Sequence, residues 1–199
     1  LRKAFPKQLQ GMYESAELDQ AIRAGVESPD PPPPTPRRDD GSVLVFMPGL
    51  REIRRALTVL GPTCREQGLE LHALHGSMEL AEQQGVLEPS PRRRVIVATN
   101  VAETGLTIPQ VTMVIDSGLH RVAAYDAARG INTLYLSRIS RSNAGQRAGR
   151  AGRTAPGRCV RLWSKADETS MAESLLPDIL RLELSSLRLQ AASLPEPVN

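Results

Sequence analysis

The 199-residue sequence has no uninterrupted apolar run of about 18 residues and no pattern typical of a secretory signal peptide. Both absences argue against a membrane-spanning or secreted chain and favour a cytoplasmic one. Cysteine is also scarce, because Cys64 and Cys159 are the only thiols. They lie far apart in the sequence, and we expect both to be reduced packing residues. The chain starts at Leu1 rather than at methionine, so we expect it to be part of a longer protein.

Aromatic residues and lysine are scarce as well. The chain has two Phe, three Tyr and one Trp. If it binds a nucleic acid, stacking of bases on aromatic side chains is therefore not expected to be the main contact. Lysine occurs only at positions 3, 7 and 165, which leaves arginine as most of the 25 basic residues. A GC-rich genome can produce that bias. The clustering of arginines is therefore more informative than the net charge of +3.

Two sequence motifs for nucleotide chemistry are absent. No Gly-Lys-Ser/Thr run occurs, since none of the lysines follows a glycine, and there is no Asp-Glu-Ala-His. Transfer of a phosphoryl group needs a phosphate cradle, a magnesium site and a group that orients water. Any such site to which this chain contributes must therefore be shared with another domain. A metal site within the chain is not expected either, because His72 and His75 have no third ligand nearby.

The pattern of apolar residues predicts an α/β domain over residues 41–165. Short apolar runs predict parallel strands, and helical patterns alternate with them. The predicted strands are 42–47, 68–74, 95–99, 111–116 and 158–163, and the predicted helices begin at Leu50 and Met78. In such sheets ligands bind outside the carboxyl ends of the strands. The turns at Pro48, Gly76, Asn100 and Ser117 follow those ends, so we expect the functional site there.

Three other segments flank or interrupt the sheet. They are residues 1–40, residues 121–139 and residues 166–199. The first is predicted to form a helix at 12–26 and a proline-rich insertion loop at 28–36. The second is predicted to form a β-hairpin in which Gly130 supplies the positive φ of a short loop. The third is predicted to be helical over 167–190, with Pro177 in the first turn of a new helix and apolar residues that pack on the sheet domain or on a neighbour.

The most informative stretch is the arginine segment, residues 146–153, which reads Gln-Arg-Ala-Gly-Arg-Ala-Gly-Arg. Its arginines recur every third residue, so on a helix they fan across one side. Gly149 and Gly152 leave the backbone beside these arginines without side chains, so a ligand can approach closely. Each glycine inside a helix lowers stability by about 1 kcal/mol relative to alanine. A solvated helix face does not explain that cost, whereas close approach of a ligand does. Because guanidinium binds phosphate through two hydrogen bonds, the segment predicts a phosphate-sensing element.

Four motifs in order carry a specific resemblance. They are Leu44-Val-Phe-Met-Pro-Gly-Leu-Arg-Glu-Ile53, Leu74-His-Gly-Ser77, Val97-Ala-Thr-Asn-Val-Ala-Glu-Thr-Gly-Leu-Thr-Ile108, and the arginine segment followed by Thr154-Ala-Pro-Gly157. Together they resemble the second RecA-like domain of DEAH-box (DEAH/RHA) helicases of the bacterial HrpA and HrpB type. The resemblance implies a RecA-like, P-loop NTPase-type parallel sheet with helices on both faces, a projecting β-hairpin, and the start of a winged-helix region at 166–199. The alternative for the hairpin is an ordinary hairpin at the edge of the sheet.

The resemblance also implies roles for individual residues. The γ-phosphate of ATP or another NTP would be faced by Gln146, Arg150 and Arg153, the two arginines acting as arginine fingers. The nucleotide-binding positions would be Gly105, Leu87, Pro109 and Arg147, although Arg147 is more simply a brace for the segment. The nucleic-acid backbone would be bound by Thr99, Asn100, Thr107, Gly76, Ser77 and Arg51, with loop capping as the alternative for each. Glu103 and Thr104 would couple the two sites.

Three positions depart from the family pattern. Leu87 stands where many members have a Phe that packs on the nucleotide base. Pro109 stands where many have an Asp that touches the ribose, and Gly105 replaces a common Ser near the phosphates. These departures predict a slower or less base-selective NTPase with its arginine fingers intact.

The leading interpretation is the second motor domain of an ATP-dependent RNA helicase. ATP with Mg²⁺ would be bound mainly by the first RecA-like domain of the same protein. That domain would be one partner of this chain. The others would be RNA, or alternatively DNA, and a downstream winged-helix domain. The other interpretation is a non-catalytic nucleic-acid-binding or regulatory module derived from such a domain. The spacing of Gln146, Arg150 and Arg153 favours the enzyme. Because half of the site is absent, we expect the isolated chain to be inactive.

Overall fold

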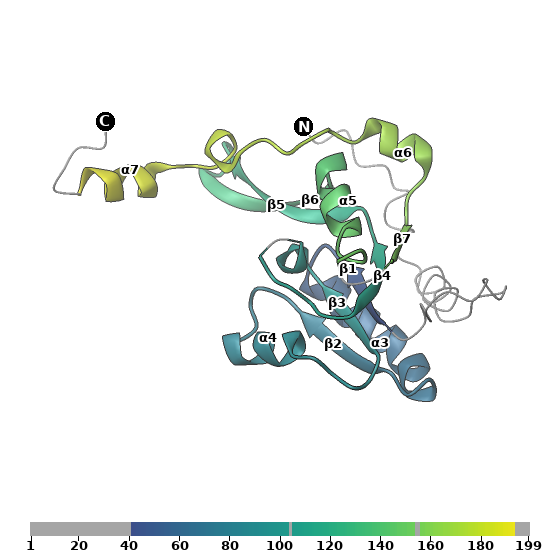
Figure 1. Ribbon diagram of the computed structural model, residues 1–199. Helices are drawn as coiled ribbons and strands as arrows, with labels where there is room; N and C mark the ends of the chain where they lie inside the picture. Colours follow the sequence, from purple (N-terminus) through teal and green to yellow (C-terminus); the bar gives the residue numbers. More distant parts are fainter. Residues whose placement is uncertain (1–40, 104, 154–155, 194–199) are drawn as a thin grey trace.

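The structure is a computed structural model that describes residues 41–103, 105–153 and 156–193. Five parallel strands form one sheet in the order β2-β3-β1-β4-β7 (Figure 1). Their bounds are β1 Ser42–Phe46, β2 Glu70–Leu74, β3 Arg94–Ala98, β4 Val111–Asp116 and β7 Arg158–Arg161. The sequence predicts all five. The expected N-terminal helix, the proline-rich loop and Thr104 lie outside the described residues.

Helices cover both faces of the sheet because its inner strands are apolar on both sides. They are α3 (Leu50–Glu66), α4 (Leu80–Leu87) and the short 3₁₀ helix η2 (Asn100–Ala102). On one face Val45 of β1 packs in a cluster with Ile53 of α3, and on the other Leu44 packs in a cluster with Val86 of α4. This arrangement confirms the predicted fold class. Within the described ranges no helix is both long and apolar enough to cross a membrane.

The predicted hairpin is confirmed as β5 (Leu119–Asp126) and β6 (Ile131–Arg138), which pair antiparallel. Gly130 has the expected positive φ, +68°, in the turn between them. Gly118, two residues after the end of β4, has a φ of +73°, and a Cβ there would lie 2.6 Å from the Trp163 ring. Only glycine fits this position. The hairpin therefore leaves the sheet at the carboxyl end of β4.

The arginine segment is only partly helical, so the predicted single helix with three arginines on one side is wrong. α5 (Arg141–Ala148) ends inside the segment, with Gly149 as its C-terminal cap. After it, the N–H groups of Arg150 and Ala151 each bond back three residues at 3.1 Å. The glycines lie at or past the helix end, so they do not carry the cost of glycine inside a helix.

The C-terminal region is helical only in pieces, so the prediction of helix over 167–190 is partly wrong. The pieces are α6 (Lys165–Ser170), the 3₁₀ helix η3 (Asp178–Leu180) and α7 (Ser185–Ala192). The chain is extended at Met171 and at Pro177, which caps η3. Apolar residues here are more than half exposed rather than packed on the sheet domain: Leu176, Ile179, Leu180, Leu187 and Leu189. Packing on a neighbour stays a prediction, and α7 points away from the other elements (Figure 1).

Residues 172–183 tie the hairpin to α5. The first two N–H groups of α5 donate to the carbonyls of Ala172 and Glu173 at 2.9 and 3.0 Å. Farther along, the Tyr125 N–H of β5 donates to Arg181 O at 2.8 Å. The hairpin, α5 and this segment therefore form one layer beyond the end of the sheet (Figure 1).

Candidate functional site

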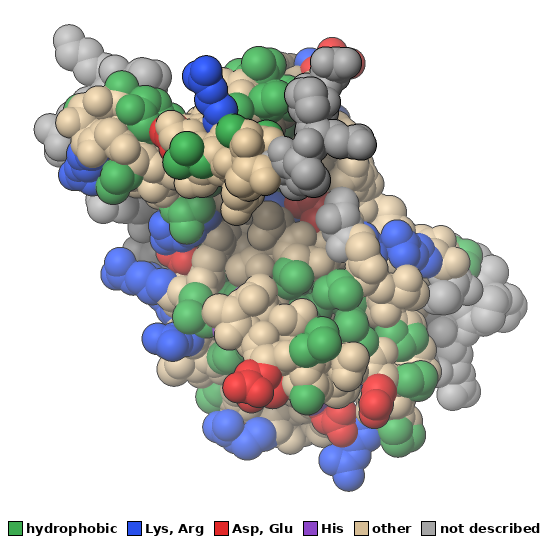
Figure 2. Space-filling view, turned by 90° about the vertical axis from the view of Figure 1, so that its left-hand side faces the viewer, with side chains coloured by type: hydrophobic (Ala, Val, Ile, Leu, Met, Phe, Trp, Pro, Cys, Tyr) green, Lys and Arg blue, Asp and Glu red, His purple; other side chains and the backbone are tan. Residues whose placement is uncertain are grey.

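Polar residues lie at the carboxyl edge of the parallel sheet. Because the strands are parallel, the residues that follow them meet at one edge. The structure places Arg51 in the first turn of α3, Gly76 and Ser77 after β2, and Thr99 and Asn100 after β3. All except the half-buried Thr99 are exposed. Figure 2 shows a hollow in the surface between the lower part of the molecule, which contains the parallel sheet, and the upper part, which contains the hairpin.

Arg147 lies at the centre of a buried cluster behind this edge. Its side chain is 0% exposed, and it donates from Nε to Glu103 Oε2 and from Nη1 to Asp116 Oδ1, both at 2.9 Å. Nη1 also donates to Leu119 O at 3.2 Å, and the guanidinium lies 4.8 Å from the centre of the Phe46 ring. Arg147 therefore braces α5 against the loop after β3 and the root of the hairpin. This geometry does not fit direct nucleotide binding by its side chain.

Arg150, the other predicted arginine finger, is also buried. Its Nε donates to Glu103 O at 3.1 Å, and its two terminal nitrogens donate to the carbonyls of Glu103 and Leu106. Burial, together with the nearby Arg153 charge, lowers the pKa of the Arg150 guanidinium. All three guanidinium nitrogens bind the loop after β3. A role at a γ-phosphate would require Arg150 to leave these carbonyls.

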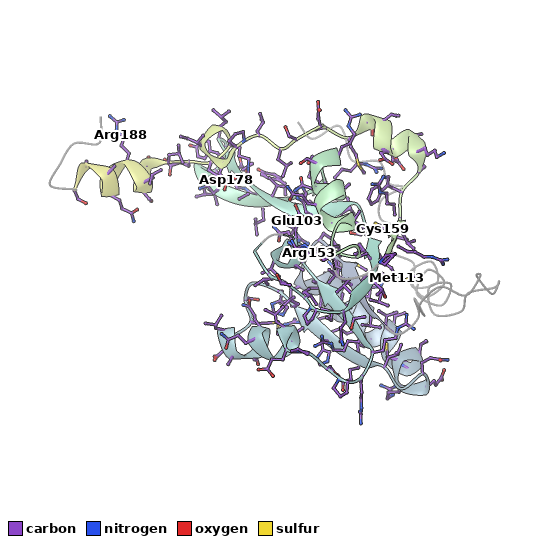
Figure 3. All side chains as sticks on the ribbon, viewed as in Figure 1. Glu103, Met113, Arg153, Cys159, Asp178 and Arg188 are labelled. Atoms are coloured by element: carbon purple, nitrogen blue, oxygen red, sulfur yellow. The ribbon has the colours of Figure 1, made fainter. Side chains whose placement is uncertain are left out.

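Arg153 is the arginine of the segment that stays exposed. Its Nη1 donates to Thr107 Oγ1 at 3.3 Å, so it contacts a predicted nucleic-acid residue. Gln146, on α5, is exposed as well. Figure 3 shows Glu103 and Arg153 where the sheet meets α5. Two of the three residues predicted to face a γ-phosphate are therefore accessible at this junction.

The three positions that depart from the family pattern have local structural roles. Gly105 has a φ of +77°, a left-handed conformation that would be strained for serine. Leu87 ends α4 and packs, half-buried, against the core. Pro109 is half-buried and precedes Gln110, which has a φ of +63° in the turn into β4. Nucleotide binding at these positions stays a prediction.

Sequence reasoning missed three polar residues of the buried cluster. Asp116 ends β4, and burial raises the pKa of its carboxyl group while the Arg147 charge lowers it. Asn143 lies one turn before Arg147 and donates from Nδ2 to Glu103 Oε1. His120 is 4% exposed, and burial together with the Arg147 charge lowers its pKa to about 4. Only Asp116 had a sequence signal, because a charged residue at the end of an apolar strand requires a buried partner.

His120 is expected to make the stability of the domain depend on pH. Its pKa is about 4 when folded and 6.5 when unfolded. Between these values the unfolded chain binds the extra proton, so stability falls as the pH falls. Replacing His120 with glutamine should reduce the fall in the free energy of unfolding between pH 7 and pH 5 by roughly 1 to 2 kcal/mol. Urea unfolding of both proteins at both pH values measures the difference.

Asp116 does not obscure this comparison. The raised pKa of the Asp116 carboxyl group makes stability rise as the pH falls, which is opposite to the effect of His120. Because Asp116 is present in both proteins, its effect cancels in the comparison. An unchanged pH dependence in His120→Gln would show that the ring has the same pKa in the folded and unfolded states, and so that burial does not lower it.

Comparison with known proteins identifies relatives of this chain. Residues 36–155 match the family described as the helicase conserved C-terminal domain. The chain is 40% identical over 157 residues to an ATP-dependent RNA helicase HrpA homolog of Haemophilus influenzae, covering 77% of this chain and 12% of that protein. It is 38% identical over 156 residues to the ATP-dependent RNA helicase HrpB of Escherichia coli, covering 77% and 19%. The crystal structure of the E. coli DEAH/RHA helicase HrpB matches with a TM-score of 0.77 at 32% identity, covering 98% of this chain and 24% of that one. The chain therefore spans 12% to 19% of the length of these two curated relatives.

Proposed function

We propose that this chain, which belongs to the helicase conserved C-terminal domain family in its DEAH-box branch, serves as the second motor domain of an ATP-dependent RNA helicase. The observation that carries the proposal is the exposure of Gln146 and Arg153 at the end of the sheet, where Arg153 contacts Thr107. A domain that approaches this edge with a bound triphosphate would meet these two side chains.

Arg153 would act as an arginine finger. Its planar, permanently charged guanidinium can bind two oxygens of the transferring phosphoryl group and stabilise the charge that develops there. Gln146 offers an amide that can orient the attacking water. The hydrogen bond to Thr107 would hold Arg153 near the edge until the first RecA-like domain approaches. Arg150 would join as a second finger only after releasing its carbonyl partners.

The rest of the ATP site would come from the first RecA-like domain. The two acidic residues of the cluster, Glu103 and Asp116, are both buried and paired with Arg147 at 2.9 Å, so neither can ligate Mg²⁺ in this arrangement. Across the described part of the chain, no three His, Cys, Asp or Glu side chains form a group that could hold a metal. The residues present would therefore suit the phosphate end of ATP rather than its metal ion. Mg²⁺ and the phosphate cradle would belong to the partner domain.

The residues at the carboxyl edge would bind the RNA backbone. The hydroxyl of Ser77, the amide of Asn100 and the guanidinium of Arg51 are exposed groups of the kind that contact phosphate and sugar without reading bases. Thr99, Thr107 and Gly76 extend the same edge. Such binding would weaken with salt and depend little on base sequence.

A winged-helix domain would be a further partner. The exposed apolar residues of the C-terminal region, among them Leu176, Ile179 and Leu180, would supply the surface on which it packs. Covering such residues removes apolar area from water, which stabilises the contact.

A non-catalytic RNA-binding module is the second candidate, favoured by the position of Arg150. With its guanidinium bound to the carbonyls of Glu103 and Leu106, one of the two expected fingers is out of reach of a phosphate. Such a module would keep the edge that binds RNA and lack hydrolysis.

The distinguishing experiment is RNA-stimulated ATP hydrolysis by the full-length parent protein, with the isolated 199-residue chain beside it. The motor function predicts turnover that RNA accelerates in the parent, and none in the isolated chain. A parent that binds RNA but hydrolyses no ATP would support the non-catalytic module. Hydrolysis by the isolated chain would contradict a site shared between domains.

A further inference from the structure

The exposed side of α3 is strongly basic near the start of the helix. Three arginines there are exposed, and their spacing of three and four residues makes them neighbours on the helix surface. Together they form the basic face of α3, which consists of Arg51, Arg54 and Arg55. Among the residues that the structure describes, none of the three forms an ion pair. Their charges therefore face water.

This placement is unfavourable for the helix itself. Like charges three or four residues apart on a helix repel one another. Arg51 also lies in the first turn, where the helix dipole favours acidic side chains and disfavours basic ones. Folding of the domain therefore does not account for three arginines at these positions, whereas binding of an anionic ligand does.

The arginine-rich composition of the chain does not account for the basic face either. α4 covers the opposite face of the sheet, and residues 76–91, which contain it, include no Lys or Arg. The exposed charged residues there are Glu79, Glu82 and Glu88. A compositional bias would act on both helices alike. The positive charge is therefore concentrated on one face of the sheet.

The basic face begins at the carboxyl edge of the sheet, where the proposed RNA contacts lie. α3 starts just after the turn that follows β1, and Arg51 belongs both to the face and to those contacts. From the root of the hairpin, Arg121 reaches the same turn. Its Nη2 donates to Glu52 Oε1 at 3.4 Å, and a Cβ on Gly49 would lie 2.6 Å from its Nε. Arg55 lies about 6 Å farther along the helix axis than Arg51. Basic groups therefore continue from the hairpin root, past the edge, onto α3.

We propose that the basic face of α3 is an additional binding surface for the RNA backbone, which extends a bound strand beyond the motif residues at the carboxyl edge. The proposal rests on the proposed motor function, whose RNA contacts it continues. Exposed arginines on an open helix face suit a ligand that carries closely spaced negative charges and needs no fit of shape, and a nucleic-acid strand is such a ligand. An acidic protein surface would match the charge, but the continuity with the edge favours RNA. Contacts to phosphate add affinity without reading the base sequence.

The test compares two double variants of the full-length parent. Arg54→Gln with Arg55→Gln removes the two charges of the basic face that lie outside the motifs. Arg65→Gln with Arg92→Gln is the matched control, because these two exposed arginines lie at the amino end of the sheet, in the last turn of α3 and just before β3. All four side chains are exposed, so the melting temperature should change little. The measurements are the Kd for two single-stranded RNAs of different base sequence over a range of salt, and ATP turnover as a function of RNA concentration.

The α3 double variant is expected to bind RNA more weakly and with less dependence on salt. Its Kd should rise roughly 10- to 100-fold at about 0.05 M salt, and the slope of log K against log salt should flatten by about 1.4, since each phosphate contact on a single strand contributes about 0.7. The loss should be the same for both RNAs. The RNA concentration that gives half-maximal ATP turnover should rise by a similar factor, whereas kcat at saturating RNA should change far less. The control double variant should bind RNA as the wild type does.

Equal losses in the two double variants would attribute the effect to net charge and would overturn the proposal. Wild-type RNA binding in the α3 double variant would overturn it alone, would leave the proposed motor function standing, and would make an acidic protein the better partner for this face. A wild-type parent that binds no RNA would overturn the proposed RNA contacts and this surface together.

Discussion

Replacing Arg153 with alanine in the full-length parent is expected to lower RNA-stimulated ATP turnover by a factor of about 1000. Among the three arginines of the segment, Arg153 is the exposed one, whereas Arg147 and Arg150 are 0% and 5% exposed. Its hydrogen bond to the neutral hydroxyl of Thr107, at 3.3 Å, is one that a charged phosphate would displace. Neither buried arginine can replace it without leaving its partners. Most of the stabilisation of transition-state charge by guanidinium groups is therefore expected to depend on Arg153.

Two further variants make this result specific. Arg153→Lys keeps the charge but loses the planar fork, so it should recover only a small part of the turnover. Arg65→Ala is the matched control, because Arg65 is an exposed arginine in the last turn of α3, at the far end of that helix from the carboxyl edge. It should leave turnover unchanged, and both alanine variants should still bind RNA. If Arg153→Ala turns over ATP as the wild type does, the segment is a binding surface and the non-catalytic module is the better account.

The strands of the sheet could be predicted because their signal is local. Each is a short apolar run between turn residues, and burial on both faces makes the run nearly continuous. β4, predicted at 111–116, is observed at Val111–Asp116. The hairpin turn carries a similarly local signal, because Gly130 has the positive φ that glycine adopts easily.

The arginine segment could not be predicted in the same way, because its partners are distant in sequence. The spacing of three fits a helix, but α5 ends at Ala148. Arg147 turns toward a carboxylate that lies 44 residues earlier, on Glu103. Arg150 turns toward carbonyls of the same loop, including that of Leu106. Local periodicity indicates a segment suited to phosphate, but which arginine is free depends on these long-range contacts.

The C-terminal region shows another limit of sequence reasoning, because the described part of the sheet domain leaves its apolar residues exposed, and only the predicted packing on a neighbour is left to cover them. Ile179 and Leu180 of η3 are 64% and 69% exposed. A sequence pattern identifies an apolar face, but it does not say whether the surface that covers this face belongs to the same domain.

Replacing Arg147 with methionine is expected to destabilise the domain by about 3 to 5 kcal/mol. The change leaves the buried carboxylates of Glu103 and Asp116 without the positive charge that both contact at 2.9 Å. Methionine is flexible and fills much of the same space, so the lost charge outweighs any cavity. Urea unfolding of the isolated chain at pH 7 measures the change.

The triple variant Glu103→Gln, Asp116→Asn, Arg147→Met separates charge from packing. It removes all three charges together, so it should recover most of the stability lost in Arg147→Met. The pH dependence of the single variant is a second test, because Arg147 is the main influence that lowers the Asp116 pKa against burial. Without it that pKa rises further, the folded protein binds a proton that the unfolded chain does not, and the deficit should shrink as the pH falls from 7 toward 5. A deficit independent of pH, or a triple variant no more stable than the single one, would mean that packing of Arg147 on Phe46, rather than its ion pairs, holds α5 to the sheet.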